Sequence, residues 1–187
     1  MIIPGFIIAM VTFPGVIVHE LAHQFFCRLF KVPVFKVCYF RVGNPSGYVI
    51  HEPPSSPWTS LLIGIGPLFV NSVVGPLVAL PAVLGLKFNS GGGAEGFDLV
   101  MVWINMFLIW LGFSIAMHSF PSTGDAASIW KKITESGHSI WLKIVGVPLV
   151  GLIWAGAVGS VFWLDAIYGG FIVGFLPGIL VHAIAAL

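Results

Sequence analysis

The chain has 187 residues, of which 58% are hydrophobic and only 8% are charged, and its formal net charge is +1. Soluble globular domains carry about 25% charged residues, so this chain has too few charges to cover a water-facing surface. The composition therefore predicts an integral membrane protein in contact with a lipid bilayer. The small net charge gives no reason to expect nucleic acid as a partner.

Several apolar stretches are long enough to cross a bilayer, which takes about 20 residues of helix. They cover residues 2–27, 59–86, 98–120, 140–163 and 166–186. We therefore predict an all-α polytopic membrane protein with about five transmembrane helices. Because only a tight turn near Asp165 separates the last two stretches, the alternative is four spans with a re-entrant end.

The basic residues indicate the orientation of these helices. Seven of the eight basic residues lie in the connections 28–58 and 121–143, and the eighth, Lys87, lies in the connection after the second stretch. By the positive-inside rule, the two basic connections face the cytoplasm. We therefore expect a multi-pass protein of the cell membrane with its N-terminus outside and its C-terminus inside.

The connection 28–58 contains a segment of a different kind, "VPVFKVCYFRVGNPSGYVIHE" at residues 32–52. It is rich in Val, Phe and Tyr, which favour strands, and it is interrupted by "GNPSG", a strong turn signal. The segment predicts a small β-hairpin, which the basic residues would place on the cytoplasmic side.

The first apolar stretch contains "HELAH", in which His19 and His23 lie four residues apart on one helix face. This spacing lets two imidazoles bind one Zn²⁺, and Glu20 lies near enough to reach a water molecule at that metal. Ionisable groups inside a bilayer are costly unless they are paired or bound. The stretch therefore predicts one zinc ion per chain. The alternative is a polar cluster that only ties helices together.

Catalytic zinc usually has three protein ligands and one open position, so a third ligand must come from elsewhere in the chain. Asp125, in "HSFPSTGDA", follows the predicted cytoplasmic end of the third stretch, at the level of the two histidines. Pro121 and Gly124 interrupt the helix there and let the backbone turn inward. We predict Asp125 as the third ligand, with His118 as the alternative ligand or as a hydrogen-bond partner of the site.

The other acidic residues near the apolar stretches are less suitable as ligands. Glu95, Asp98 and Asp165 are expected at the membrane face opposite to the two histidines. This topology is the reason for preferring Asp125 among the acidic residues.

Three motifs resemble those of the site-2 protease family of intramembrane zinc metalloproteases. They are "HELAH", then "GIGPLFVN" with Asn71 at the start of the second stretch, and "FPSTGDA" at the end of the third. In this chain one more residue separates Pro67 from Asn71 than in the family, and Ala126 follows Asp125 where the family has glycine. The resemblance implies a three-helix metalloprotease core over 1–135, with the hairpin at 32–52, followed by two additional transmembrane helices over 136–187.

The function that the resemblance implies is that of a zinc metalloendopeptidase, which cleaves transmembrane segments of membrane-protein substrates near the cytoplasmic face. His19, His23 and Asp125 would hold the zinc. Glu20 would take a proton from the attacking water and pass it to the leaving amine. Asn71 would hold the substrate backbone or help to stabilise the oxyanion. The hairpin would either accept an unwound substrate segment as an added strand or simply cap the site.

Two other functions use the same residues. An inactive protease-like membrane protein would bind transmembrane helices without cutting them, but it would have no need of Glu20. A metal-binding transport or sensing protein would need a polar path across the bilayer, and residues 140–163 and 166–186 offer little polarity for one.

Overall fold

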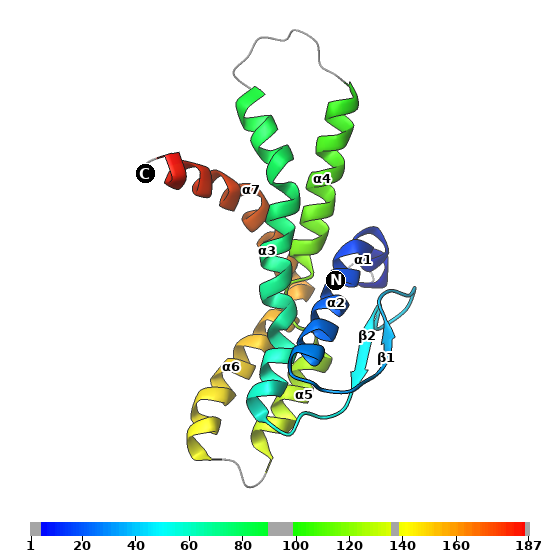
Figure 1. Ribbon diagram of the computed structural model, residues 1–187, viewed down its shortest axis with the longest axis vertical. Coiled ribbons are helices and arrows are strands. Elements are labelled where there is room, and N and C mark those ends of the chain that lie inside the picture. The colour runs from blue at the N-terminus through cyan, green and yellow to red at the C-terminus, as the bar shows by residue number, and fades with distance from the viewer. Residues whose placement is uncertain (1–4, 90–98, 136–138, 186–187) are drawn as a thin grey trace.

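The computed structural model describes residues 5–89, 99–135 and 139–185, with the side chains of 87–89 and 180–185 excepted. The described chain is mostly helical and has one small two-stranded sheet (Figure 1). In chain order its elements are α1 (Gly5–Val11), α2 (Phe13–Leu29), β1 (Val34–Cys38), β2 (Tyr48–His51), α3 (Pro57–Asn89), α4 (Leu99–Met117), α5 (Thr123–Thr134), α6 (Ile140–Gly159), the 3₁₀ turn η1 (Ser160–Phe162) and α7 (Leu164–Ala185). The Gly-rich connection with Glu95 and Asp98 lies outside the described residues.

Within the described residues, three stretches of helix are long and apolar enough to cross a membrane: Pro57–Leu86, Leu99–Met117 and Ile140–Phe162. A fourth is present if α1 and α2, which meet at an angle of 93°, are counted as one broken span. The apolar part of α7 that passes the same search, Leu164–Ile179, is shorter. The structure therefore supports a membrane protein with three or four candidate spans, and the predicted five remain an expectation.

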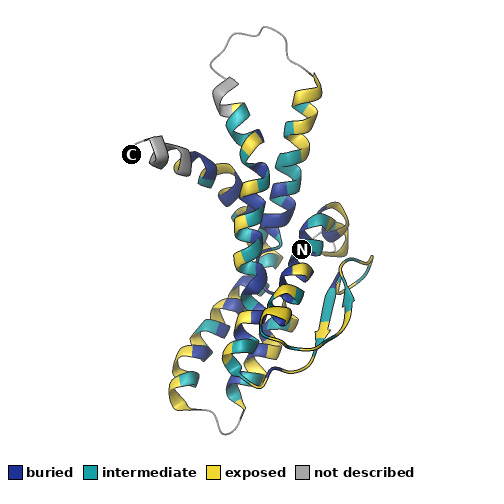
Figure 2. Ribbon diagram, in the orientation of Figure 1, coloured by how far each residue is buried: buried dark blue, intermediate teal, exposed yellow. Residues whose placement is uncertain are grey.

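The long helix α3 forms the axis of the molecule, and the other helices are arranged along it (Figure 1). α4 runs beside the upper part of α3, whereas α5 and α6 lie beside its lower part, and α7 leads away from the middle. Figure 2 shows that the buried residues concentrate in the middle, where these helices meet. The candidate ligands of α2 also lie in this region, because α2 packs against α3 and α4.

The break between α1 and α2 determines how the start of α2 packs against α4. Pro14 lies in the first turn of α2, where a missing backbone N–H costs nothing. Gly15 packs directly against α4: its N–H donates to Ser114 Oγ at 3.0 Å, and a Cβ at Gly15 would lie 1.9 Å from Ser114 O. Ser114 Oγ in turn donates to Thr12 O at 2.8 Å. Only glycine permits this approach, which brings the next turn of α2 up to the end of α4.

Two apolar clusters attach the last two helices to the rest of the chain. The lower cluster joins α3, α5 and α6 through Leu61, Ala126, Ile129, Ile133, Val150 and Ile153. The upper cluster joins α3, α4 and α7 through Ala79, Ala116, Ile172 and Val173. The helices assigned to a separate region by the sequence therefore pack on the predicted core, and the lower cluster holds α5 in place beneath the site.

The predicted hairpin is present. β1 and β2 pair antiparallel, with Cys38 opposite Tyr48, and the connection between them contains the expected turn residues. Tyr39 Oη donates to Gln24 Oε1 at 2.7 Å, which ties the hairpin to α2. The hairpin lies along the side of α2, the helix that carries HELAH (Figure 1).

Candidate metal centre

Three side chains that could hold a metal ion converge from two helices. His19 and His23 come from α2 and Asp125 comes from the first turn of α5, and their ligand atoms lie within 4.8 Å of one another. Asp125 Oδ1 is 3.5 Å from His23 Nε2, and Asp125 Oδ2 is 3.9 Å from His19 Nε2. Both histidines are buried. These are the three ligands predicted from the sequence.

Backbone carbonyls determine which ring nitrogen of each histidine can bind a metal. His19 Nδ1 donates to His118 O at 2.7 Å, and His23 Nδ1 donates to Ile63 O at 2.9 Å. Because a carbonyl oxygen only accepts, the proton of each neutral imidazole lies on Nδ1 and the lone pair on Nε2. Each ring is thus held in the tautomer that a metal ligand needs.

The two free nitrogens point at each other. His19 Nε2 and His23 Nε2 are 3.1 Å apart, and the two rings meet edge to face. Two neutral imidazoles in this arrangement bring their lone pairs together, which is unfavourable unless a cation or a proton lies between them. Two nitrogens sharing one tetrahedral zinc, at bonds of about 2.0 Å, would be about 3.3 Å apart. The arrangement therefore fits a metal ion of this kind.

Asp125 is held toward the histidines by the start of its own helix. Ser122 N and Ser122 Oγ donate to Asp125 Oδ2 at 2.8 and 2.7 Å, and Asp125 N donates to Ser122 Oγ at 3.1 Å. This is a capping box, which ties the third helical residue to the residue before the helix. Burial raises the pKa of the Asp125 carboxyl, but protonated His23 and His19 outweigh burial through their charges and hydrogen bonds and hold this pKa well below its usual range. A bound cation would act on the carboxyl in the same direction as these protons.

Helix α5 itself was missed by the sequence analysis, which treats residues 121–143 as a connection. The signal was available: Ser122 and Asp125 stand at the capping-box spacing directly before an amphipathic segment. The predicted break at Pro121 is present, since α4 ends at Met117 and α5 begins at Thr123. The bonds from Ser122 hold the carboxylate in place. The sequence analysis did not identify this cap and relied on Pro121 and Gly124 for the inward turn of the backbone.

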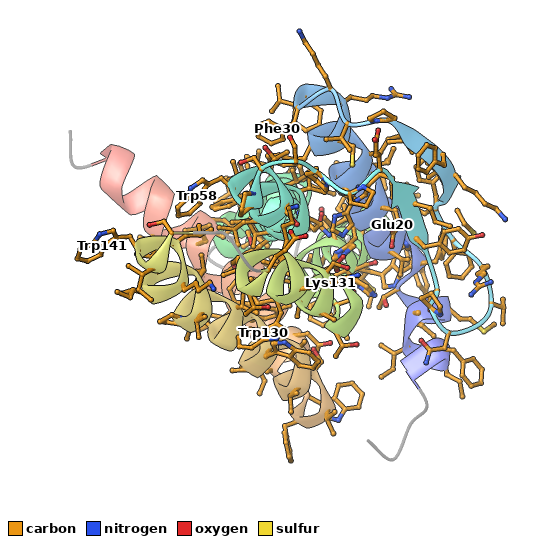
Figure 3. The ribbon with its side chains drawn as sticks, turned by 90° about the horizontal axis from the view of Figure 1, so that it is seen from below. Glu20, Phe30, Trp58, Trp130, Lys131 and Trp141 are labelled. Carbon is orange, nitrogen blue, oxygen red and sulfur yellow. The ribbon has the colours of Figure 1, made fainter. Side chains whose placement is uncertain are left out.

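Glu20 follows His19 on α2 and is also buried, with 7% of its surface exposed. It does not belong to the group of three candidate ligands, and Figure 3 shows it on the side of α2 that faces the hairpin. It lines a cavity of about 670 Å³ that also reaches His19, His23 and Asp125. Glu20 thus lines the same cavity as the candidate ligands, as a base acting beside a metal must.

His118 takes part in the centre through its backbone. Its carbonyl accepts from His19 Nδ1, whereas its own Nδ1 donates to Ser114 O at 3.0 Å. Its ring lines the cavity but does not join the three candidate ligands. The predicted supporting role is therefore available to the main chain of His118 and does not require the imidazole.

Asn71 lies behind the centre. It is fully buried, and its amide nitrogen donates to Ile115 O at 3.1 Å and to His118 O at 3.0 Å, with Gly15 O at 3.4 Å. Asn71 is not one of the described residues that line the cavity. These contacts join α3 to the end of α4 and orient the carbonyl that holds His19. Binding of a substrate backbone or an oxyanion by Asn71 stays a prediction.

Replacing Asn71 with alanine should weaken metal binding without removing any ligand. The His118 carbonyl would lose its second donor, so His19 would be held less firmly, and groups that orient ligands typically contribute about 10- to 100-fold to metal affinity. Competition with a chromophoric chelator measures this affinity. Asn71→Asp, which lacks the amide donor, should behave like the alanine variant, whereas unchanged affinity in both would contradict the role.

The cavity also reaches an acidic residue that the sequence analysis placed at the opposite membrane face. Asp165 lines it together with Ser160, because α7 packs against the end of α4, where a Cβ at Gly169 would lie 2.9 Å from Met117 N. The expectation that Asp165 and Asp125 lie at opposite membrane faces is therefore wrong, since both residues line this cavity. His51 also lines the cavity, and its Nδ1 donates to Glu52 O at 2.8 Å.

Comparison of the chain with protein-family models, with curated proteins and with solved structures found no match. The resemblance to the site-2 protease family therefore rests on the three sequence motifs. The structure adds the observation that residues from two of these motifs, about a hundred positions apart, meet at one point.

Proposed function

We propose that this protein is an intramembrane zinc metalloprotease that hydrolyses a peptide bond within a transmembrane segment of another membrane protein. The observation that carries the proposal is the meeting of His19, His23 and Asp125 within 4.8 Å, beside a buried glutamate, in a chain of apolar helices. Burying such a group in a membrane protein is costly unless its members are paired or bind an ion, so its presence favours a functional metal site.

The donor set suits zinc. Two imidazole nitrogens and one carboxylate oxygen are common ligands of catalytic zinc sites, which leave a fourth position open. When bound, Zn²⁺ supplies a Lewis acid that polarises a scissile carbonyl and acidifies a water molecule. The carboxylate also offsets part of the charge of the ion, which lowers the cost of holding it among apolar helices.

Glu20 would perform the proton transfers. As general base it takes one proton from the attacking water, while the oxygen of that water forms a bond to the scissile carbonyl carbon. It then gives the proton to the amide nitrogen as the carbon–nitrogen bond breaks, so the products are a carboxylic acid and an amine. With a metal bound, His19 and His23 would be neutral, because the carbonyls of His118 and Ile63 accept from Nδ1 and the metal would take the lone pair of Nε2.

The surroundings of the cavity support this proposed class of substrate. The cavity is lined by residues of α2, α3 and α5 and by the hairpin connection that includes Asn44 and Gly47. A substrate bond would have to leave its helix to reach such a site, since helical backbone groups are already bonded to one another. A transmembrane segment that unwinds locally fits this requirement. We propose that the site lies near the cytoplasmic face of the cell membrane, because the two basic connections should face the cytoplasm.

The function is tested by measuring zinc and cleavage on the same purified samples. The wild-type protein, reconstituted with a reporter membrane helix, should contain close to one zinc per chain and should cut the reporter. An Asp125→Ala sample prepared in parallel should contain little zinc and should not cut the reporter. Zinc without cleavage in the wild type would instead favour a protein that binds helices without cutting them, or a metal transport or sensing protein.

The proposed orientation can be tested at the hairpin. A cysteine placed at Ser46, in a chain with Cys27 and Cys38 replaced, should not react with an impermeant thiol reagent added to intact cells, because the basic connections should hold the hairpin inside. The same cysteine should react once the cells are permeabilised. Ready labelling of intact cells would reverse the orientation and move the site to the other face.

A further inference from the structure

Gly47, the last residue before β2, lies directly against Glu20. A Cβ placed on Gly47 would be 2.7 Å from Glu20 Cγ, 2.9 Å from Oε1 and 3.1 Å from Cδ. Real Cβ atoms essentially never approach other heavy atoms under 3.0 Å. The hairpin backbone therefore touches the Glu20 side chain along its length, and any larger residue at position 47 would displace one of the two.

This contact matters because Glu20 has little else to orient it. Within the described part of the chain, no hydrogen bond reaches the Glu20 carboxyl group, whereas Asp125 is held by the cap at Ser122. Lone pairs free of donors suit a group that must take up a proton. The conformation of the side chain must then be set by packing, and Gly47 is a neighbour that packs closely on it.

The connection that carries Gly47 is itself held in place. Arg41 N donates to Ser46 O at 2.7 Å, and Arg41 Nε donates to Pro45 O at 2.9 Å. The Arg41 guanidinium also lies over the Tyr48 ring, 5.3 Å from its centre. These contacts fix the backbone on both sides of Gly47, so that the connection can act as a firm wall of the cavity.

We infer that Gly47 is a positioning residue for Glu20: the absence of a side chain lets the hairpin wall hold the carboxylate in the cavity beside the candidate metal ligands. The catalytic consequence rests on the proposed function, but the contact itself does not. Displacing a reacting group by about 1 Å can cost about 10²-fold in rate, so the hairpin would control the chemistry as well as enclose it.

The contact can be tested through stability alone. Thermal unfolding is measured for the wild type, Gly47→Ala, Glu20→Ala and the double variant, all as full-length protein in detergent. In the presence of Glu20, the alanine at 47 should lower Tm by about 2–8 °C, as overpacking does. With Glu20→Ala this loss should largely disappear, because alanine lacks the three atoms that lie nearest. Such non-additivity is the mark of direct contact.

Gly43 provides the matched control in the same connection. A Cβ there meets only Arg41 Nε, at 3.9 Å, although its φ of +158° disfavours other residues. Whatever its size, the effect of Gly43→Ala on Tm should be the same with and without the Glu20 side chain. An equal loss of Tm for Gly47→Ala in both backgrounds would overturn the inference.

The catalytic consequence is tested separately on the reporter helix. Gly47→Ala should keep close to one zinc per chain, because the three atoms nearest to a Cβ at position 47 all belong to Glu20 and none to a candidate ligand. The variant should lower kcat by about 10- to 100-fold with little change in KM. A wild-type rate in this variant would overturn the positioning role. If the wild type cuts no reporter, the proposed function fails, while the stability measurements still decide the contact.

Discussion

Asp125→Ala should lose most of its bound zinc and all measurable cleavage. The carboxylate is the one anionic member of the group of three, and it comes from α5, on the far side of the centre from both histidines. Without it, two neutral imidazoles would have to hold a divalent ion in an apolar setting with no opposing charge. Metal analysis by mass spectrometry and reporter cleavage measure the two losses.

His118→Ala is the matched control for this prediction. The imidazole of His118 also lines the cavity, but His19 is held by the carbonyl of residue 118, which alanine retains. We therefore expect this variant to keep close to one zinc per chain, with any loss of affinity below that of Asp125→Ala. The reverse result, zinc lost with His118→Ala and kept with Asp125→Ala, would make His118 the third ligand and the Asp125 assignment wrong.

Glu20→Gln should abolish cleavage while leaving zinc at close to one per chain. The amide has nearly the same shape and size as the carboxylate but cannot take a proton from water. Loss of a general base typically costs about 10²- to 10⁴-fold in rate. Glu20 does not belong to the group of three candidate ligands, so metal content should not follow activity in this variant.

The comparison between the two variants separates the roles of their residues. Asp125→Ala should lose zinc and cleavage together, whereas Glu20→Gln should lose cleavage alone. Loss of zinc from Glu20→Gln would show that Glu20 is a ligand, and appreciable cleavage by it would show that another group takes the proton. Either result would require different roles for the residues that line the cavity.

Local sequence was sufficient for those features that depend on local geometry. His19 and His23 share a helix face because four residues make about one helical turn, whatever surrounds the helix. The turn residues at 43–47 predicted a hairpin because glycine, asparagine and proline favour a reversal of the chain. The low charge content predicted a membrane protein, and the structure has the long apolar helices that this requires.

The tertiary structure alone decided how distant parts meet. The carbonyls that hold the two histidine rings belong to His118 and Ile63, and no sequence signal could reveal them, since every residue carries the same backbone carbonyl. Asp165 reaches the cavity because α7 packs beside the end of α4. A count of apolar stretches placed this residue at the other membrane face.

The contact between Gly47 and Glu20 is also a feature that only the tertiary structure decides. A glycine in a turn has an ordinary local explanation, and its sequence position says nothing of which side chain the missing Cβ leaves room for. Likewise, the motif at Asp125 suggested a ligand, but only the packing of α5 against α3 and α6 through the lower cluster brings that carboxylate to α2. Periodicity along the chain determines which groups share a face, whereas side-chain packing between helices determines which faces meet.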